Sequence, residues 1–243
     1  MINITIYVIL RIMNGFKVKE ARRAAGWTQE RLAKALGCSQ PYLSLMENGR
    51  RTVPEALRRK MVRVLGLPLT YLPVRSKQPG GSSSGDWARR RLGELSYPGY
   101  RYLGKRRRPS VNPTEVLLRV LTCDPCDPRL MEAMPWLLLH FSGFDREALV
   151  EQARRSNVQN RLGFVTALAR ETAKSAPRYN KRLDELNLLD EALEFFRLAR
   201  QDDLGQNFKT RRFRDYVHEN RSGAATHWNI LTTLAPHHLN YDG

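Results

Sequence analysis

The sequence predicts an all-α protein made of two helical parts joined by a flexible linker. Apolar residues recur at intervals of three and four through most of the chain, as is typical of amphipathic helices. Helix-starting and helix-ending residues bracket these stretches, and the alternation typical of strands is missing from residue 112 to about residue 234. A Gly/Ser-rich run, RSKQPGGSSSGD at residues 75–86, separates the two parts.

The first part is expected to be a five-helix domain at residues 14–73. Gly26 and Gly37 are typical helix-stop residues. Thr28 and Ser39 are typical N-cap residues, because a side-chain oxygen can accept a hydrogen bond from the first turn of a helix. The expected elements are helices at 17–25, 28–36 and 40–47, a helix that begins at Pro54, and a short turn at 68–73.

The rest of the chain divides into a flexible linker at 74–86, a basic tyrosine-rich segment at 87–111 and an all-α domain at 112–243. The run Asn112-Pro113-Thr114-Glu115 has the features of a helix start. This last domain is expected to be a multi-helix bundle or a solenoid-like array. Its expected helices are 113–122, 128–141, 145–156, 158–175, 178–201, 209–220 and 224–233.

The ends and cysteines of the chain indicate a cytoplasmic protein. The N-terminal MINITIYVIL is apolar, but it lacks a basic start and is shorter than the roughly 20 residues of a membrane span. Residues 1–12 are interpreted as a short strand or as an extension upstream of Met13, and no membrane partner is expected. The three cysteines, Cys38, Cys123 and Cys126, provide no disulfide framework, which favours a reducing compartment.

The sequence favours a binding protein over an enzyme, with no metal and no cofactor. Cys123 and Cys126 have the spacing of half a zinc site, but a second pair is missing. The adjacent His237 and His238 are poorly arranged to bind one metal ion. Phosphate-loop, nucleophile-elbow and HExxH motifs do not occur in the sequence, so no catalytic residue is expected.

The positive charge is concentrated in the first half of the chain. The formal net charge is +17, and residues 1–73 contain 13 Lys/Arg against 4 Asp/Glu. Residues 74–113 contain 10 against 2, whereas residues 114–243 contain 18 against 18. This segregation predicts a front half that binds a polyanion and a neutral back half with a different task.

Within the first part, the spacing of four short blocks is informative. The blocks are Gly26-Trp27-Thr28-Gln29-Glu30-Arg31-Leu32-Ala33, then Gly37, then Ser39-Gln40, then Glu47-Asn48-Gly49-Arg50. On these blocks, residues 17–73 resemble the Cro/C1-type helix-turn-helix repressors, the XRE group. The resemblance implies a DNA-binding transcriptional regulator.

The residues themselves support the same interpretation. Helices at 28–36 and 40–47, joined by a tight turn at Gly37, can pack so that the second enters a major groove. Gln40 could make a bidentate contact to adenine, and Arg50 with Arg51 is placed for phosphate contacts. The residues expected to contact DNA are Thr28, Gln29, Ser39, Gln40, Tyr42, Ser44, Asn48, Arg50 and Arg51.

Two residues of the 40–47 helix depart from the family pattern. Leu45 stands where a polar or basic residue is usual, so it can offer only an apolar contact to a thymine methyl group or turn inward. Pro41 contributes no backbone donor. Direct reading of the base sequence is therefore expected to depend on few residues.

The basic segment offers additional contacts to nucleic acid. Its two arginine-rich runs flank a tyrosine-rich turn, an arrangement that also suits stacked single-stranded RNA. The candidate residues are Arg89, Arg90, Arg91, Lys105, Arg106, Arg107 and Arg108. An RNA-associated adaptor that acts through residues 87–109 is accordingly one alternative function.

The preferred function is a repressor that binds a double-stranded DNA operator as a homodimer. The stretches NPTEVLLRVL, PWLLLHF and NRLGFVTALARE resemble proteins encoded beside nucleotidyltransferase-type toxins of the abortive-infection class. That resemblance implies an antitoxin, in which the 112–243 domain binds and neutralises a cognate toxin protein. A phage or host-type repressor with a ligand-sensing or dimerising C-terminal domain is a further alternative.

Overall fold

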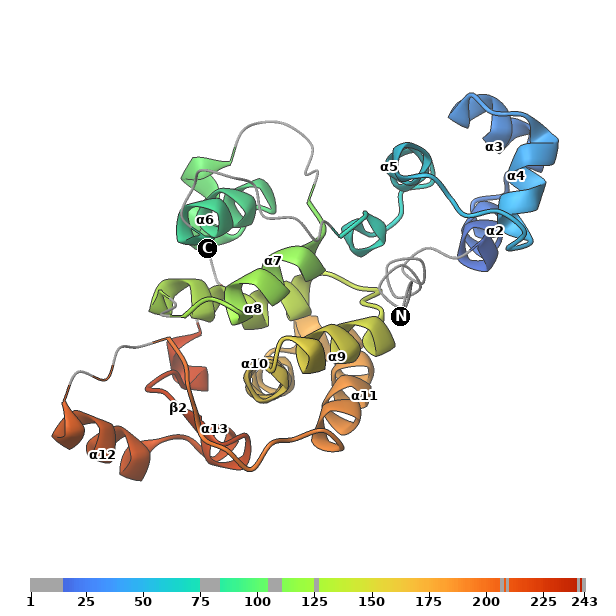
Figure 1. Ribbon diagram of the computed structural model, residues 1–243. Coiled ribbons are helices and arrows are strands. Elements are labelled where there is room, and N and C mark those ends of the chain that lie inside the picture. The colour runs from blue at the N-terminus through green and yellow to red at the C-terminus, as the bar shows by residue number, and fades with distance from the viewer. Residues whose placement is uncertain are drawn as a thin grey trace.

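The structure is a computed structural model that describes residues 15–74, 84–104, 111–124, 127–205, 208, 210–239 and 241 (Figure 1). It confirms the all-α class. In the described part of the chain the strands β1 (Asp202–Asp203) and β2 (Ile230–Leu231) have two residues each and pair in parallel. This small sheet was not expected from the sequence, because two residues are too few to show an alternating pattern.

The N-terminal domain consists of α2 (Gly15–Ala24), α3 (Gln29–Leu36), α4 (Gln40–Glu47), α5 (Glu55–Val64) and the 3-10 turn η1 (Leu69–Tyr71). These five elements match the predicted ones closely. Their apolar faces form a small core of their own, made by residues such as Val18, Leu32, Leu36, Leu43, Met46 and Met61. At the start of α2, a Cβ on Gly15 would lie 1.6 Å from the carbonyl oxygen of Met46, so only glycine allows this close approach to α4.

The next segment differs from its prediction. Residues 75–83 lie outside the described residues, but Ser84–Asp86, assigned to the linker, form the first turn of α6 (Ser84–Glu94). The basic tyrosine-rich segment continues as α6 and η2 (Pro98–Leu103) and packs into the large C-terminal core. Its side chains Trp87, Tyr97 and Tyr100 are buried there. The aromatic residues that suggested a stacking surface are therefore mostly core residues.

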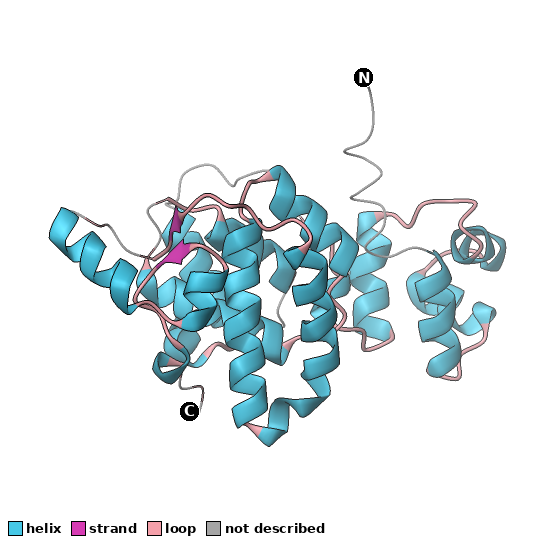
Figure 2. Ribbon diagram, turned by 90° about the horizontal axis from the view of Figure 1, so that it is seen from below, coloured by secondary structure: helices cyan, strands magenta, loops and turns pink. Residues whose placement is uncertain are grey.

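The C-terminal helices form a bundle rather than a solenoid, with α10 (Gln159–Ser175) inside it (Figures 1 and 2). Helix α10 contacts α8 (Pro128–His140), α9 (Arg146–Arg155), α11 (Leu183–Glu194) and α13 (Gly223–His227). The remaining elements of this region are α7 (Pro113–Leu121), η3 (Pro177–Arg182), α12 (Arg211–Asn220) and η4 (Pro236–His238). Helix α12 extends away from the bundle in both views.

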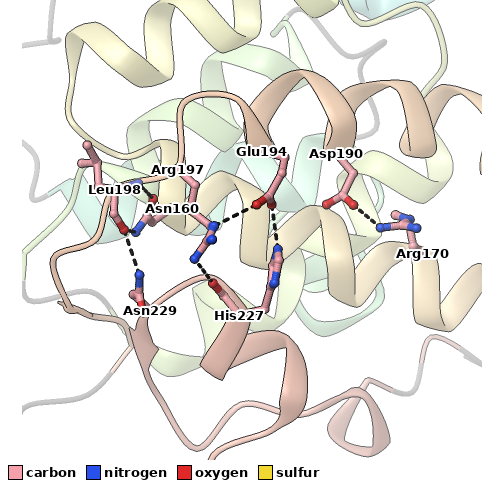
Figure 3. Close-up of polar contacts among 8 residues, drawn as sticks. All are labelled: Asn160, Arg170, Asp190, Glu194, Arg197, Leu198, His227 and Asn229. Atoms are coloured by element: carbon pink, nitrogen blue, oxygen red, sulfur yellow. Dashed lines mark hydrogen bonds and ion pairs between the residues drawn. The ribbon is translucent and has the colours of Figure 1, made fainter.

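Two predicted helices are shorter than expected. The 178–201 helix is divided into η3 and α11 and ends at Glu194, because the Asn160 side chain forms two hydrogen bonds with the backbone of Leu198, at 2.9 and 2.8 Å. The 224–233 helix ends at His227, because Asn229 adopts a left-handed conformation with φ of 53°. The Asn229 side chain also donates to the Leu198 carbonyl, so the segments that follow α11 and α13 are joined at Leu198 (Figure 3).

Ion pairs close to this point tie α11 to its neighbours (Figure 3). Glu194 accepts a hydrogen bond from Arg197, at 2.9 Å, and forms a 2.7 Å contact with the His227 ring. Asp190, one turn earlier, pairs with Arg170 of α10. Burial raises the pKa of Asp190 despite the opposing charge of Arg170. The polar residues here position helices within the bundle.

The two parts of the protein contact each other directly through η1. The buried Asn112 side chain donates hydrogen bonds to the carbonyls of Thr70 and Leu72, at 2.8 and 2.6 Å. The Thr70 hydroxyl donates to the carbonyl of Ser142, at 2.6 Å. Leu69 packs against both hydrophobic cores. We call this set of contacts around η1 the interdomain clasp.

Candidate DNA-binding surface

Helices α3 and α4 are connected by a turn whose local signals act as predicted. The Thr28 hydroxyl accepts a hydrogen bond from the Arg31 amide, and the Ser39 hydroxyl accepts one from the Tyr42 amide. Gly37 ends α3 in the left-handed region, with φ of 72°, where a glycine is favoured. The short turn lets α3 and α4 pack on a shared core and leaves one face of α4 exposed.

A buried ion pair fixes α4 to α2. The Arg22 guanidinium donates to both carboxylate oxygens of Glu47, at 2.6 and 3.0 Å, and to the Trp27 carbonyl, at 2.7 Å. Burial opposes ionisation of the Glu47 carboxyl, but hydrogen bonds from Arg22 and Gln29 outweigh it and lower its pKa. The carboxylate is therefore charged and fully partnered, as a buried charge must be.

The ion pair continues as a chain of side-chain amides that reaches the first residue of α4. Gln29 donates to the Glu47 carboxylate, at 2.8 Å, and accepts from the amide of Gln40, at 2.6 Å. One donor and the carbonyl oxygen of Gln40 form no hydrogen bond with another described residue, and they are the pair that a bidentate contact to adenine requires. We call this series, Arg22–Glu47–Gln29–Gln40, the glutamine relay.

The remaining exposed face of α4 is narrow. Pro41, Leu45 and Asn48 are exposed, and Ser44 is half-buried and accepts a weak hydrogen bond from Asn48, at 3.4 Å. Leu45 has 36% of its surface exposed, so it points outward rather than into the core. This face offers an apolar contact in the position where the family pattern has a polar one.

Two arginines lie at the end of this face. The amides of Arg50 and Arg51 both donate to the Leu45 carbonyl, at 2.9 and 3.1 Å, and Gly49 has a φ of 70°. Both arginine side chains are exposed, and the Arg51 guanidinium lies over the Tyr42 ring, 5.3 Å from its centroid. The turn thus places two cations beside the C-terminal end of α4.

A family model described as a helix-turn-helix domain matches residues 15–72. Residues 15–72 are a helix-turn-helix domain. This domain supports the assignment of the chain as a DNA-binding transcription regulator. Neither the curated proteins nor the solved structures contain a significant match to the chain.

The helix-turn-helix domain brings together most residues that the sequence singled out for DNA contact. Gln29 and Gln40 are bonded to each other, Ser44 and Asn48 share the open face of α4, and Arg50 and Arg51 follow it. Thr28 and Ser39 are exposed cap residues at the two helix starts. Tyr42 instead packs half-buried against the domain core. Whether these residues contact DNA stays a prediction.

Sequence reasoning did not identify Arg22 and Glu47 as part of this surface. Glu47 was quoted for its place in the Glu47-Asn48-Gly49-Arg50 block, but its complete burial was not expected. Charged residues at helix positions are exposed far more often than buried. The signal that could have revealed the pair is that Glu47 and Arg22 both fall on the apolar faces of their helices, beside Met46 and Val18.

The second group of predicted nucleic-acid contacts is less favourably arranged. Arg89 pairs with Asp86 and Asp127, at 2.7 and 2.6 Å, and Arg91 pairs with Glu94, at 2.8 Å. Arg90 is exposed. Lys105, Arg106, Arg107 and Arg108 lie outside the described residues. Because two of the three described arginines are matched by carboxylates, they contribute little free positive charge to this surface.

The cysteine and membrane predictions can be placed on the structure only in part. Cys123 contacts the Ser84 hydroxyl, at 3.0 Å, and donates to the Arg119 carbonyl, while Cys126 lies outside the described residues. Among the described residues, His, Cys, Asp and Glu side chains do not gather in threes around a possible metal position. Within the same residues, no helix combines the length and the apolar character needed to cross a bilayer.

Proposed function

We propose that the protein is a sequence-specific repressor that binds its operator through α4. The glutamine relay is the observation that carries this proposal, since it holds the Gln40 amide at the start of α4 with one donor and one acceptor unused by the part of the chain that the structure describes. A pre-oriented amide loses little side-chain entropy on binding, which favours recognition of one base over another.

The proposed contacts divide into those that read bases and those that set position. Gln40 forms a bidentate contact to adenine, and Leu45 packs against a thymine methyl group. Exposed Arg50 and Arg51 neutralise phosphates, and the free amides at the start of α3, next to Thr28, bind another phosphate. With so few base contacts, a single domain recognises a half-site, so we propose that two copies bind a two-fold symmetric operator.

Footprinting on the DNA upstream of the gene tests this function. We expect the wild-type protein to protect a discrete site, and Gln40→Ala to lose preference for one base pair, by about 1–3 kcal/mol. Arg50→Ala should weaken binding to all sequences alike and reduce the salt dependence. Binding of equal strength to every duplex, unchanged in both variants, would contradict the proposal.

The resemblance noted above suggests that the C-terminal bundle binds a cognate toxin, and we propose this as the finer role. The bundle has its own hydrophobic core and carries no net charge beyond residue 113, as suits a protein-binding unit rather than a second DNA-binding one. Co-expression with the neighbouring gene tests it: the neighbour should arrest growth alone and be neutralised by the full chain. A harmless neighbour would refute the antitoxin role and leave operator binding untouched.

A further inference from the structure

A pocket of about 190 Å³ lies in the C-terminal bundle between α8, α9 and α11. Its walls are mainly apolar and are formed by Leu138, Phe144, Leu186, Leu188 and Leu189. An apolar cavity of about 150 Å³ is sufficient to hold benzene. The pocket therefore has room for one small ring or a short branched chain, and its walls favour an apolar group.

The charged residues that line the pocket leave one positive charge unbalanced. Arg146, Arg182 and Glu185 line the pocket, and Arg182 pairs with Glu185 at 2.8 Å. The Arg146 side chain is exposed, and it forms neither an ion pair nor a hydrogen bond with another described residue. The carboxylate of a small ligand would pair with Arg146 while the apolar body of the ligand fills the pocket. The lining thus fits a small apolar carboxylate.

The segment at residues 141–144 separates this pocket from the interdomain clasp. On one side, Gly143 and Phe144 line the pocket. On the other, the Ser142 carbonyl accepts the hydrogen bond from Thr70. Gly143 has a φ of 74°, and a Cβ on it would lie 3.1 Å from the Tyr71 ring, so this segment touches η1 closely.

Arg182 connects the pocket to the same segment by hydrogen bonds. Its guanidinium donates to the Phe141 carbonyl, at 2.5 Å, and to the Leu138 carbonyl, at 3.2 Å, while it also pairs with Glu185. A carboxylate that pairs with Arg146 would also attract the Arg182 guanidinium, which lines the same pocket, away from these carbonyls. The 141–144 segment would then lose a contact that fixes it to the bundle, and the Ser142 carbonyl that accepts from Thr70 would be held less firmly.

We propose that this pocket is an effector site for a small apolar carboxylate, and that its occupancy loosens the interdomain clasp. The binding site stands on the pocket alone. Its regulatory meaning rests on the proposed function, because loosening the clasp changes how the helix-turn-helix domain is presented to an operator.

Calorimetric titration of the full chain with benzoate tests the site, with benzyl alcohol as the uncharged probe of similar shape. We expect benzoate to bind more tightly than benzyl alcohol, and Arg146→Gln to weaken benzoate about fivefold. Leu188→Asp should prevent benzoate binding, because Leu188 is 48% exposed and the new carboxylate at the pocket repels the ligand without disturbing the core. Arg155→Gln, on the same helix but away from the pocket, is the matched control.

The proposed site is overturned if benzoate binds no better than benzyl alcohol, or if it binds wild type and Leu188→Asp equally well.

The coupling between the pocket and the interdomain clasp is tested by hydrogen exchange, read at the Tyr71 and Leu72 amides, which are hydrogen-bonded within η1. Saturating benzoate should accelerate their exchange about threefold or more. Unchanged or slower exchange in the benzoate-bound protein overturns the coupling.

These measurements need no DNA, so they separate this inference from the proposed function. If footprinting shows no operator while benzoate binds and exchange accelerates, the repressor proposal fails and the site stands. If a specific operator is found but benzoate does not bind, the site fails and the repressor proposal stands.

Discussion

At the scale of single residues, the buried pair Arg22–Glu47 supports the proposed DNA-binding face from inside the domain. It joins α2 to α4, and through Gln29 it also orients Gln40. The most exposed part of α4, by contrast, makes few contacts within the protein. The Glu47 carboxylate therefore contributes both to the stability of the domain and to the orientation of the residue proposed to read a base.

Glu47→Gln tests this dependence. The substitution leaves the Arg22 guanidinium buried without a counter-charge, and breaking one side of a buried pair typically costs about 3–5 kcal/mol. We expect α3 and α4 to open more readily, with a loss of about 3 kcal/mol measured by hydrogen exchange at their amides. The exposed Glu30→Gln is the matched control, and a similar loss there would contradict the explanation.

The same pair predicts a dependence on pH. Because the pKa of Glu47 is lowered in the folded protein, the carboxylate stabilises the fold fully above its ordinary value of 4.5. This stabilisation is lost as the pH falls below 4.5 and through the lowered folded-state pKa. Exchange measured at α3 and α4 should therefore show an acid-induced loss of stability in wild type that is smaller in Glu47→Gln. Equal acid sensitivity in both proteins would be inconsistent with a partnered carboxylate.

At the scale of elements, the close approach of α10 to Trp228 organises the C-terminal bundle. A Cβ on Gly163 would lie 2.4 Å from the ring of Trp228, which is 1% exposed. The indole therefore occupies the space that a side chain on α10 would fill. This contact brings the short α13 and β2 back against the central helix.

Gly163→Ala should therefore destabilise the bundle. The ring cannot move aside cheaply in a close-packed core, so overpacking is expected to cost about 1–3 kcal/mol despite the better helix propensity of alanine. Gly223→Ala is the matched control, since a Cβ there meets nothing within 4 Å. Thermal unfolding followed by tryptophan fluorescence distinguishes the two variants. Equal unfolding midpoints would show that the Trp228 ring shifts to make room for the new methyl group.

The same scale shows which parts of the fold the sequence could predict. The α3–turn–α4 unit was predictable because its signals are local: Thr28 and Ser39 cap the helices, and Gly37 ends one. The end of α11 was not, because it depends on Asn160, which lies 38 residues from Leu198 in the sequence. Of the glutamine relay, Gln29 and Gln40 were predicted as site residues, but Arg22, Glu47 and the hydrogen bonds among the four were not. The buried partners in the relay belong to helices far apart in the chain.

At the scale of the whole molecule, the predicted linker does not leave the two domains independent. Asn112 serves two roles, because its side-chain oxygen caps α7 by accepting from the Thr114 amide while its nitrogen donates to two carbonyls of the helix-turn-helix domain. The sequence predicts the capping role of Asn112, but it does not predict the hydrogen bonds that Asn112 forms with the other domain. The clasp therefore changes the expected architecture from tethered modules to docked ones.

Asn112→Ser separates the two roles. Serine keeps an oxygen for the cap but cannot donate to both Thr70 and Leu72, so α7 should persist while the clasp opens. We expect exchange at the η1 amides to accelerate strongly, and small-angle scattering to show a larger radius of gyration. Ser222→Ala, which removes a helix cap remote from η1, controls for lost capping alone. Asn112→Ser that leaves both the exchange at η1 and the radius of gyration unchanged would contradict this role of Asn112. Leu69 and the Thr70–Ser142 hydrogen bond would then be sufficient to hold the domains together, and the 141–144 segment rather than Asn112 would control their docking.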